Sequence, residues 1–160
     1  MRRTAKLVVL ACAAGLVFSA ASFARERAAK PAFRYIGGTM AMPDHCEGEL
    51  EMGAEAMTFA CSDASVRIPY SAIHFMQYRT NISRKVRRMK PHWKVSPQTS
   101  VNLLGAKGNR YFTIVYREKD EAPLDTLVLQ VSPDDMRPYL AEIDLRVGQR
   151  VEVEYLGEVN

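Results

Sequence analysis

Acidic residues are missing from one third of this 160-residue chain: Ala64 to Arg117 contains no Asp or Glu, but eleven Lys or Arg. Seven of these cations and the only tryptophan form what we call the basic cluster: Arg79, Arg84, Lys85, Arg87, Arg88, Lys90, Trp93 and Lys94. So dense a run of uninterrupted positive charge is typical of a surface that meets a polyanion. The alternative is a solvated face, neutralised through weak ion pairs by the acidic residues of 44–63 and 118–158.

Sequence motifs of catalysis and of cofactor binding are also missing. No serine stands in a G-x-S-x-G context, and no phosphate loop or dinucleotide fingerprint is present. The three histidines, His45, His74 and His92, are isolated from one another, which does not favour a metal site. His45 and Cys46 are adjacent, and adjacent strand residues point to opposite faces, so a histidine-activated thiol is not expected. The sequence predicts a protein that is not an enzyme and has neither cofactor nor metal.

The first 24 residues have the three parts of a secretory signal peptide. Three basic residues precede an uncharged, mostly apolar stretch at 7–18, which is shorter than the roughly 20 residues of a membrane span. Small residues at Ser22 and Ala24 then predict cleavage before Arg25. In the alternative, Cys12 is the acylated cysteine of a lipoprotein.

Loss of residues 1–24 would change the charge balance, because the 22 basic residues of the chain include three in this segment. The remainder would carry 19 basic and 18 acidic residues, a net charge of +1. A general affinity for nucleic acid is therefore not expected, and no motif for specific nucleic-acid recognition is present.

Two short segments around Gly53–Ala54 predict a β-hairpin, because a glycine first in a two-residue loop suits a type II′ turn. This pairing joins residues whose numbers sum to 107, and so places Cys46 opposite Cys61. Leu50, Met52, Met57 and Phe59 then share the cysteine face. A one-residue bulge would be compatible with the pattern. We expect a Cys46–Cys61 disulfide, with a reactive or metal-binding thiol as the alternative.

Further strands are predicted by alternation and by β-branched and aromatic residues. They lie at 34–38, 66–70, 73–78, 111–116, 126–131 and 150–156. One helix is expected before the last strand, with an N-cap at Asp135 that places Pro138 in the tolerant first turn. Met136, Leu140, Ile143 and Val147 then form one apolar face, and Gly148 ends the helix.

Glycines and apolar or aromatic residues of the predicted strands and helix follow one another in a specific order along the chain. They are Gly48, Leu50, Phe59, Val66, Ile68–Tyr70, Ile73, Tyr78, Tyr111–Ile114, Tyr116, Leu140, Ile143 and Val147–Gly148. This order resembles the pleckstrin-homology-like (PH-like) family, in particular bacterial PH-like and GRAM-type domains, over residues 46–154. The resemblance implies a mainly β fold with one C-terminal α-helix, in which the helix plugs a curved sheet or partly open barrel. A small lipocalin-like barrel is the alternative. The family transfers no catalytic residue and implies a binding scaffold. A long insert and the strand after the helix depart from its minimal pattern.

The expected organisation is a signal peptide at 1–24, a disordered leader at 25–33, and a single PH-like domain at 34–157 with a basic insert at 79–110. The expected function is that of an exported, periplasmic or secreted binding module without catalysis. Its basic cluster would contact an anionic membrane surface or an envelope protein. Alternatives are an envelope accessory protein that docks by strand addition at a sheet edge, and a hydrolase with an unrecognised site.

Overall fold

A computed structural model describes residues 33–62, 64–89, 92–97, 110–118 and 122–154. In chain order its elements are β1 (Phe33–Gly38), β2 (Glu47–Met52), β3 (Ala56–Cys61), β4 (Ala64–Pro69), a 3-10 turn (Tyr70–Ala72), β5 (Ile73–Arg79), α1 (Arg84–Arg88), β6 (Arg110–Tyr116), β7 (Asp125–Val131), α2 (Pro133–Val147) and β8 (Glu152–Val153). The predicted signal peptide, Cys12, most of the leader, Lys90 and much of the insert lie outside the described residues. β1 begins one residue earlier than predicted, with Phe33 already buried.

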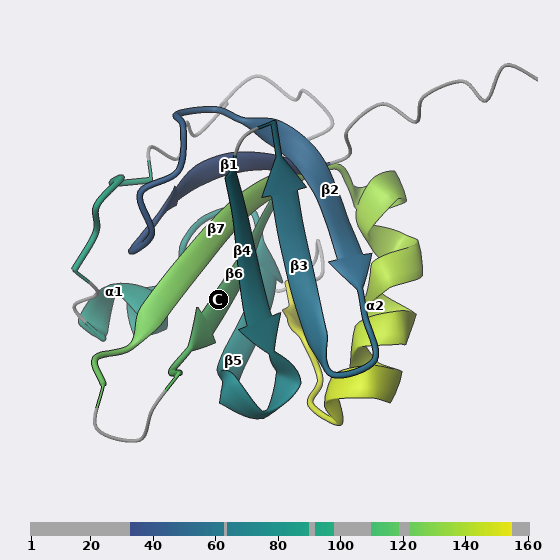
Figure 1. The fold of residues 1–160 in the computed structure, drawn as a ribbon. Coiled ribbons are helices and arrows are strands. Elements are labelled where there is room, and N and C mark those ends of the chain that lie inside the picture. The colour runs from purple at the N-terminus through teal and green to yellow at the C-terminus, as the bar shows by residue number, and fades with distance from the viewer. Residues whose placement is uncertain (1–32, 63, 90–91, 98–109, 119–121, 155–160) are drawn as a thin grey trace, which may run out of the picture.

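The strands form one curved, unclosed sheet in the order β4-β3-β2-β1-β7-β6-β5-β8 (Figure 1). All neighbouring pairs are antiparallel except β5 with β8. The fold expectation is confirmed: the protein is mainly β, with a curved sheet and one long helix near the C-terminus. A second, five-residue helix, α1, was not predicted.

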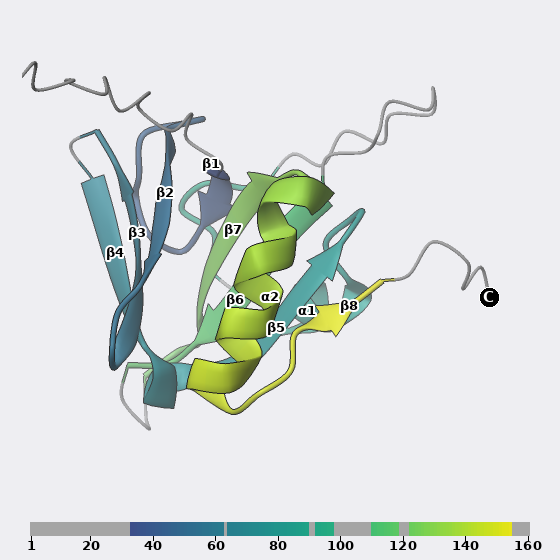
Figure 2. The same cartoon turned by 90° about the vertical axis from the view of Figure 1, so that its right-hand side faces the viewer.

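The larger hydrophobic core lies on the side of the sheet that β2–β4 and α2 enclose (Figure 2). We call this the enclosed side. Its largest fully buried side chains include Phe33, Tyr35, Met57, Phe59, Phe112, Ile114, Leu127, Leu129 and Met136. From α2, Met136 and Ile143 are fully buried while Leu140 and Val147 pack at the margin, so the predicted helix face is confirmed. Burial of one such side chain contributes about 1.5–3 kcal/mol.

The predicted hairpin forms, but its register was wrong by two residues. Leu50 pairs with Phe59 and Met52 with Met57, so the loop is Ala54–Glu55. Gly53 follows the last residue of β2 and donates to the Ala56 carbonyl, and its φ is not positive as a type II′ turn would require. Because a shift of two preserves the alternation, the predicted apolar residues still face the core.

The Cys46–Cys61 disulfide is present, with its Cα atoms 5.9 Å apart. Cys61 lies in line with Gly48 rather than with Cys46, and a Cβ on Gly48 would come within 2.0 Å of the Ala60 carbonyl oxygen and 2.9 Å of the Cys61 Cβ. The missing side chain of Gly48 therefore lets β2 approach β3 closely enough for the bond.

The start predicted for α2 was wrong. The N-cap is Ser132, whose hydroxyl accepts from the Asp135 N–H at 3.1 Å, and Pro133 occupies the first helical position. Pro138 consequently lies inside the helix and leaves the Asp134 carbonyl without its usual donor. Asp134 is exposed, so water can satisfy that oxygen. The predicted C-terminal stop is confirmed, since Gly148 adopts a left-handed conformation with φ 68°.

A smaller core covers the opposite side of β1, β7, β6 and β5, which we call the α1 side. Its buried members are Ile36, Phe75, Ile82, Val86, Tyr111, Val115 and Val128, with Met89, Trp93 and Leu124 at its margin. The segment that carries the basic cluster is thus fixed to the sheet by apolar contacts.

Candidate functional site

Helix α1 converts part of the predicted basic insert into ordered structure. Ser83 is its N-cap and accepts from the Val86 N–H at 3.3 Å. Ile82, Val86 and Met89 stand at helical spacing and pack on the α1 side, with Val86 fully buried. This helix was not predicted, because its many cations drew attention to charge instead of to apolar spacing. The i, i+4, i+7 spacing of Ile82, Val86 and Met89 around the capping Ser83 was a usable signal.

Segment 92–97 holds Trp93 against the sheet. The Gly38 N–H donates to the Val95 carbonyl at 3.0 Å, and the Gly38 carbonyl accepts from Lys94 and Val95 at 3.0 and 3.1 Å. A Cβ on the adjacent Gly37 would lie 2.6 Å from the Val95 oxygen, so the close approach needs glycine there. Trp93 is half-buried and packs at the margin of the smaller core.

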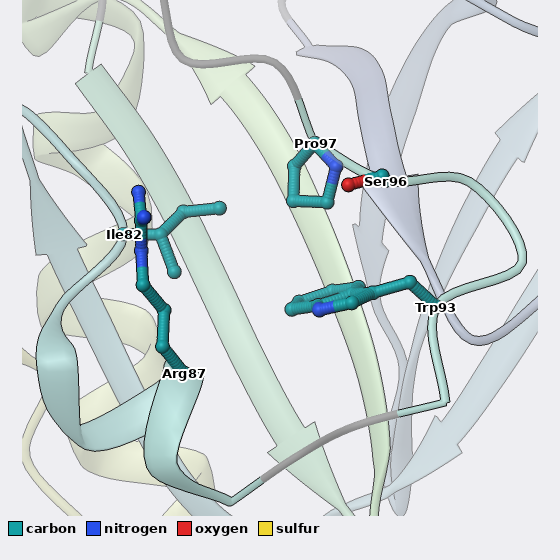
Figure 3. A pocket seen from close by; sticks show the side chains of 5 residues that line it. All are labelled: Ile82, Arg87, Trp93, Ser96 and Pro97. Atoms are coloured by element: carbon teal, nitrogen blue, oxygen red, sulfur yellow. The ribbon is translucent and has the colours of Figure 1, made fainter.

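A pocket of about 180 Å³ opens where α1 and this segment face each other. It is lined by Ile82, Arg87, Trp93, Ser96 and Pro97. In Figure 3, Ile82 and Arg87 stand on one side, and the flat indole of Trp93 lies across from them beneath Pro97. The pocket combines one cation, one aromatic plane and one hydroxyl with apolar walls.

Two members of the basic cluster are neutralised by carboxylates near the end of the chain. Lys85 Nζ lies 2.9 Å from Glu152 Oε1 and 3.6 Å from the centroid of the Phe75 ring. Arg79 donates to Glu154 Oε1 at 2.9 Å. For these two residues the self-pairing alternative is the one observed.

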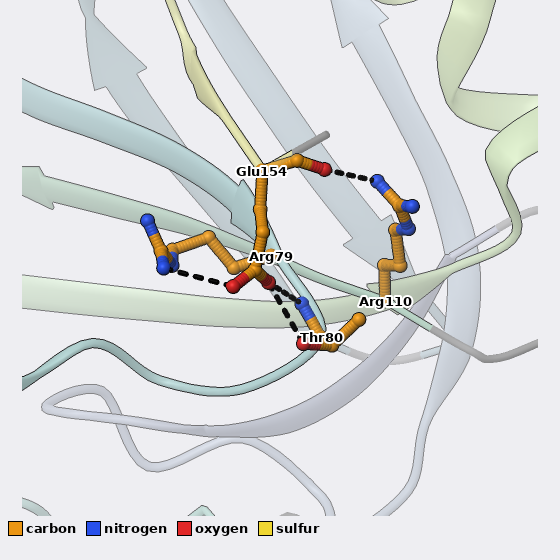
Figure 4. A network of polar contacts seen from close by, with 4 residues as sticks. All are labelled: Arg79, Thr80, Arg110 and Glu154. Carbon is orange, nitrogen blue, oxygen red and sulfur yellow. Dashed lines mark hydrogen bonds and ion pairs between the residues drawn. The ribbon is translucent and has the colours of Figure 1, made fainter. Parts of the chain in front are cut away.

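Glu154 is the centre of a polar network (Figure 4). Its Oε2 accepts from the Thr80 N–H at 3.0 Å and from the Thr80 hydroxyl at 2.7 Å. The Thr80 backbone hydrogen bond is the largest cause that lowers the pKa of Glu154, with Arg79 and Arg110 adding to it. Arg110 also donates to the Glu154 carbonyl oxygen at 2.8 Å and lies over the Tyr78 ring. Sequence reasoning did not assign Glu152, Glu154 or Arg110 to the site.

The other cations of α1 are differently placed. Arg84, Arg87 and Arg88 are exposed, and no ion pair joins any of them to another described residue. Their charges have no counterpart on the helix, because α1 contains no acidic residue.

Lys94 lies apart from the α1 arginines. With Ser96 it lines a second pocket of about 420 Å³, beside Asp44 and His45. His45 has a positive φ of 55° in the turn that closes with the Cys46 N–H on the Pro43 carbonyl. Cys46 itself is in the disulfide, so a thiol role for it does not apply.

The described residues contain no group of three or more His, Cys, Asp and Glu side chains placed to hold a metal ion. Within the same residues, no helix combines the length and apolar character needed to cross a membrane. The sequence matches no protein-family model, and no curated protein matches it at a significant level.

Proposed function

We propose that this chain is an exported, PH-like binding module without catalysis, and that α1 and Trp93 contact an anionic surface. One observation carries the proposal: the exposed arginines of α1 have no ion pair within the described structure, whereas Arg79 and Lys85 do. Positive charge that is held on an ordered helix and left uncompensated is available to an external anion.

The neighbourhood of α1 supports the same function. Val86 anchors the helix in the smaller core, so the arginines are presented from a fixed position. Trp93 and Arg87 line the same pocket from opposite sides, and tryptophan is favoured at the headgroup level of membranes. Each Lys or Arg close to an anionic membrane contributes about 1 kcal/mol, a term that salt screens.

The test uses vesicles of phosphatidylglycerol and phosphatidylcholine, with Trp93 fluorescence as the readout. Wild-type protein should show a blue shift that increased salt reverses. The double variant Arg84→Gln/Arg88→Gln should bind about 30-fold more weakly, since about 2 kcal/mol is lost. The matched control Arg67→Gln/Arg137→Gln removes the same charge from β4 and α2 and should bind as wild type. Equal binding by all three proteins would refute the proposal.

A second candidate, docking by strand addition, is favoured by the edge strand β4. The Tyr70 N–H donates to the Glu55 carbonyl on the β3 side. Because backbone groups alternate along a strand, those of Ser65, Arg67 and Pro69 point away from β3. Pro69 has no N–H, so the donors that this edge presents to a partner strand are those of Ser65 and Arg67, neither of which has a hydrogen-bond acceptor among the described residues.

Strand addition makes a different prediction. Arg67→Pro should abolish cross-linking to envelope proteins in the exporting host, because it removes an outward N–H and leaves the β3 ladder intact. Arg84→Gln/Arg88→Gln should then cross-link as wild type does. The opposite pattern would exclude β4 as the contact.

A further inference from the structure

The last strand, β8, differs from the rest of the sheet in how it is held. It is two residues long, runs parallel to β5 at the outer edge, and pairs only Glu152 with Gln77 and Val153 with Tyr78 (Figure 2). The Glu154 N–H adds one bond to the Tyr78 carbonyl at 3.1 Å. So short a parallel pairing at an edge supplies little of its own stability.

The side chains of this segment divide between the two sides of the sheet. Val153 packs against the larger core. Glu152 and Glu154 point to the α1 side, where their carboxylates contact Lys85 and Arg79 at 2.9 Å each. Arg110 lies on the other side of the sheet, over the Tyr78 ring, and donates to the Glu154 backbone carbonyl, so the two carboxylates engage two cations.

The Lys85–Glu152 ion pair is the contact of this segment that an external anion can replace most readily. The Lys85 and Glu152 side chains are each 52% exposed. Exposed ion pairs are weak and are screened by salt. A surface that bears many anions can therefore replace a single carboxylate as the partner of the lysine. Lys85 lies on α1 between Arg84 and Arg88. The lysine that Glu152 neutralises is therefore adjacent to arginines that have no ion pair in the described structure.

We infer that residues 152–154 are an internal anionic ligand, and that the surface for an anionic lipid membrane extends past the uncompensated arginines of α1 to Lys85 and Arg79. Glu152 and Glu154 compete with the membrane for these cations. Their displacement enlarges the positive surface and frees the outer edge of β5. This inference rests on the proposed function, since it names further cations of the same contact and what restrains them.

The test removes the two carboxylate charges and keeps the side-chain shape. Glu152→Gln/Glu154→Gln should bind the phosphatidylglycerol vesicles about tenfold more tightly than wild type, with a steeper salt dependence. Glu49→Gln/Glu51→Gln is the matched control, because it makes the same change in net charge on the exposed face of β2. The control should change the affinity less than twofold. Adding Lys85→Gln to the β8 variant should remove most of its gain, because Lys85 is the α1 cation that the Glu152 carboxylate neutralises.

Hydrogen exchange provides a second readout that does not depend on a variant's stability. In the wild-type protein, saturating vesicles should accelerate exchange of the Glu154 amide, which donates to Tyr78 in the free state. Amides of α2 should not change. Equal gains for the β8 variant and its control, or a Glu154 amide that stays protected on vesicles, would overturn the inference and leave the α1 contact standing. If neither wild type nor the β8 variant binds, the proposed function itself fails.

Discussion

The two sides of the sheet made by β1, β7, β6 and β5 differ in the elements that cover them and in how well their buried polar atoms are hydrogen-bonded. The enclosed side is covered by the 15-residue α2, which is capped at both ends. On this side the buried Tyr116 hydroxyl of β6 has no hydrogen-bond partner in the described structure. The α1 side is covered by a five-residue helix and segment 92–97. There the Gln77 amide and the Thr113 hydroxyl are buried and form no hydrogen bond with any described residue.

This difference indicates that the enclosed side stabilises the fold and that the α1 side serves the proposed binding. Unsatisfied buried polar groups cost stability, and exposed like charges on one helix repel one another. The enclosed side supplies the apolar burial that tolerates these costs, while the α1 side carries the uncompensated cations and the Trp93 pocket. Changes on the enclosed side should therefore affect folding, and changes on the α1 side should affect binding.

The most direct attempt to break this comparison makes one substitution on each side. Ile143→Ala, in the fully buried face of α2, should lower the free energy of unfolding by about 4 kcal/mol. Ile82→Ala should lower it by about 2 kcal/mol, because Ile82 lines an open pocket and its loss widens that pocket instead of creating a closed cavity. Urea unfolding measures both. Equal losses would mean that the two sides are packed alike.

Removal of the disulfide tests the enclosed side separately. Cys46→Ala/Cys61→Ala should cost about 3 kcal/mol, since the bond closes a loop with a sequence separation of 15. Vesicle affinity of the folded variant should stay unchanged, because neither cysteine contacts the smaller core. A loss of affinity in the folded variant would contradict the separation of the two sides.

The buried threonines sharpen the comparison further. Thr113→Val should raise the free energy of unfolding by about 1 kcal/mol, because it replaces an unpartnered hydroxyl with a methyl group of similar shape. Thr39→Val should lower it by about 1–3 kcal/mol, since that hydroxyl donates to Asp125 at 2.8 Å and accepts from the Thr126 N–H at 2.9 Å. A loss on Thr113→Val would reveal a partner for this hydroxyl, such as bound water.

Local patterns predicted more of this molecule than long-range ones did. The strands and the apolar face of α2 follow from alternation and helical spacing, which adjacent residues specify. The hairpin register was not predicted correctly, because the prediction placed Cys61 directly opposite Cys46. In the structure Cys61 lies in line with Gly48, whose lack of a side chain lets the disulfide form from this offset position. The helix start was wrong since the cap at Ser132 outweighs the cost of an internal Pro138.

The candidate site shows the same limit. The basic cluster was visible as a run of charge, yet its neutralised members were not. Glu152 lies 67 residues from Lys85, and Glu154 lies 75 residues from Arg79. The parallel pairing of β8 with β5 brings them together, and no local pattern specifies that pairing. Two carboxylates at alternate positions of the predicted final strand, Glu152 and Glu154, were the available hint.

The smallest expected effect on the free energy of unfolding comes from the tyrosines of the enclosed side. It is absent at neutral pH, because these hydroxyls lose their protons only in alkali. Burial raises the pKa of Tyr35 and of Tyr78 to about 12 from an ordinary value of 10. The unfolded chain therefore releases these protons first, so the contribution of these two tyrosines to stability is constant below pH 10 and falls as the pH rises from 10 toward 12. Urea unfolding at pH 9, 10 and 11 should show this decline, and Tyr78→Phe should make it shallower. A flat profile to pH 11 would mean that the two hydroxyls already reach water, which would contradict the dry packing that distinguishes the enclosed side from the α1 side.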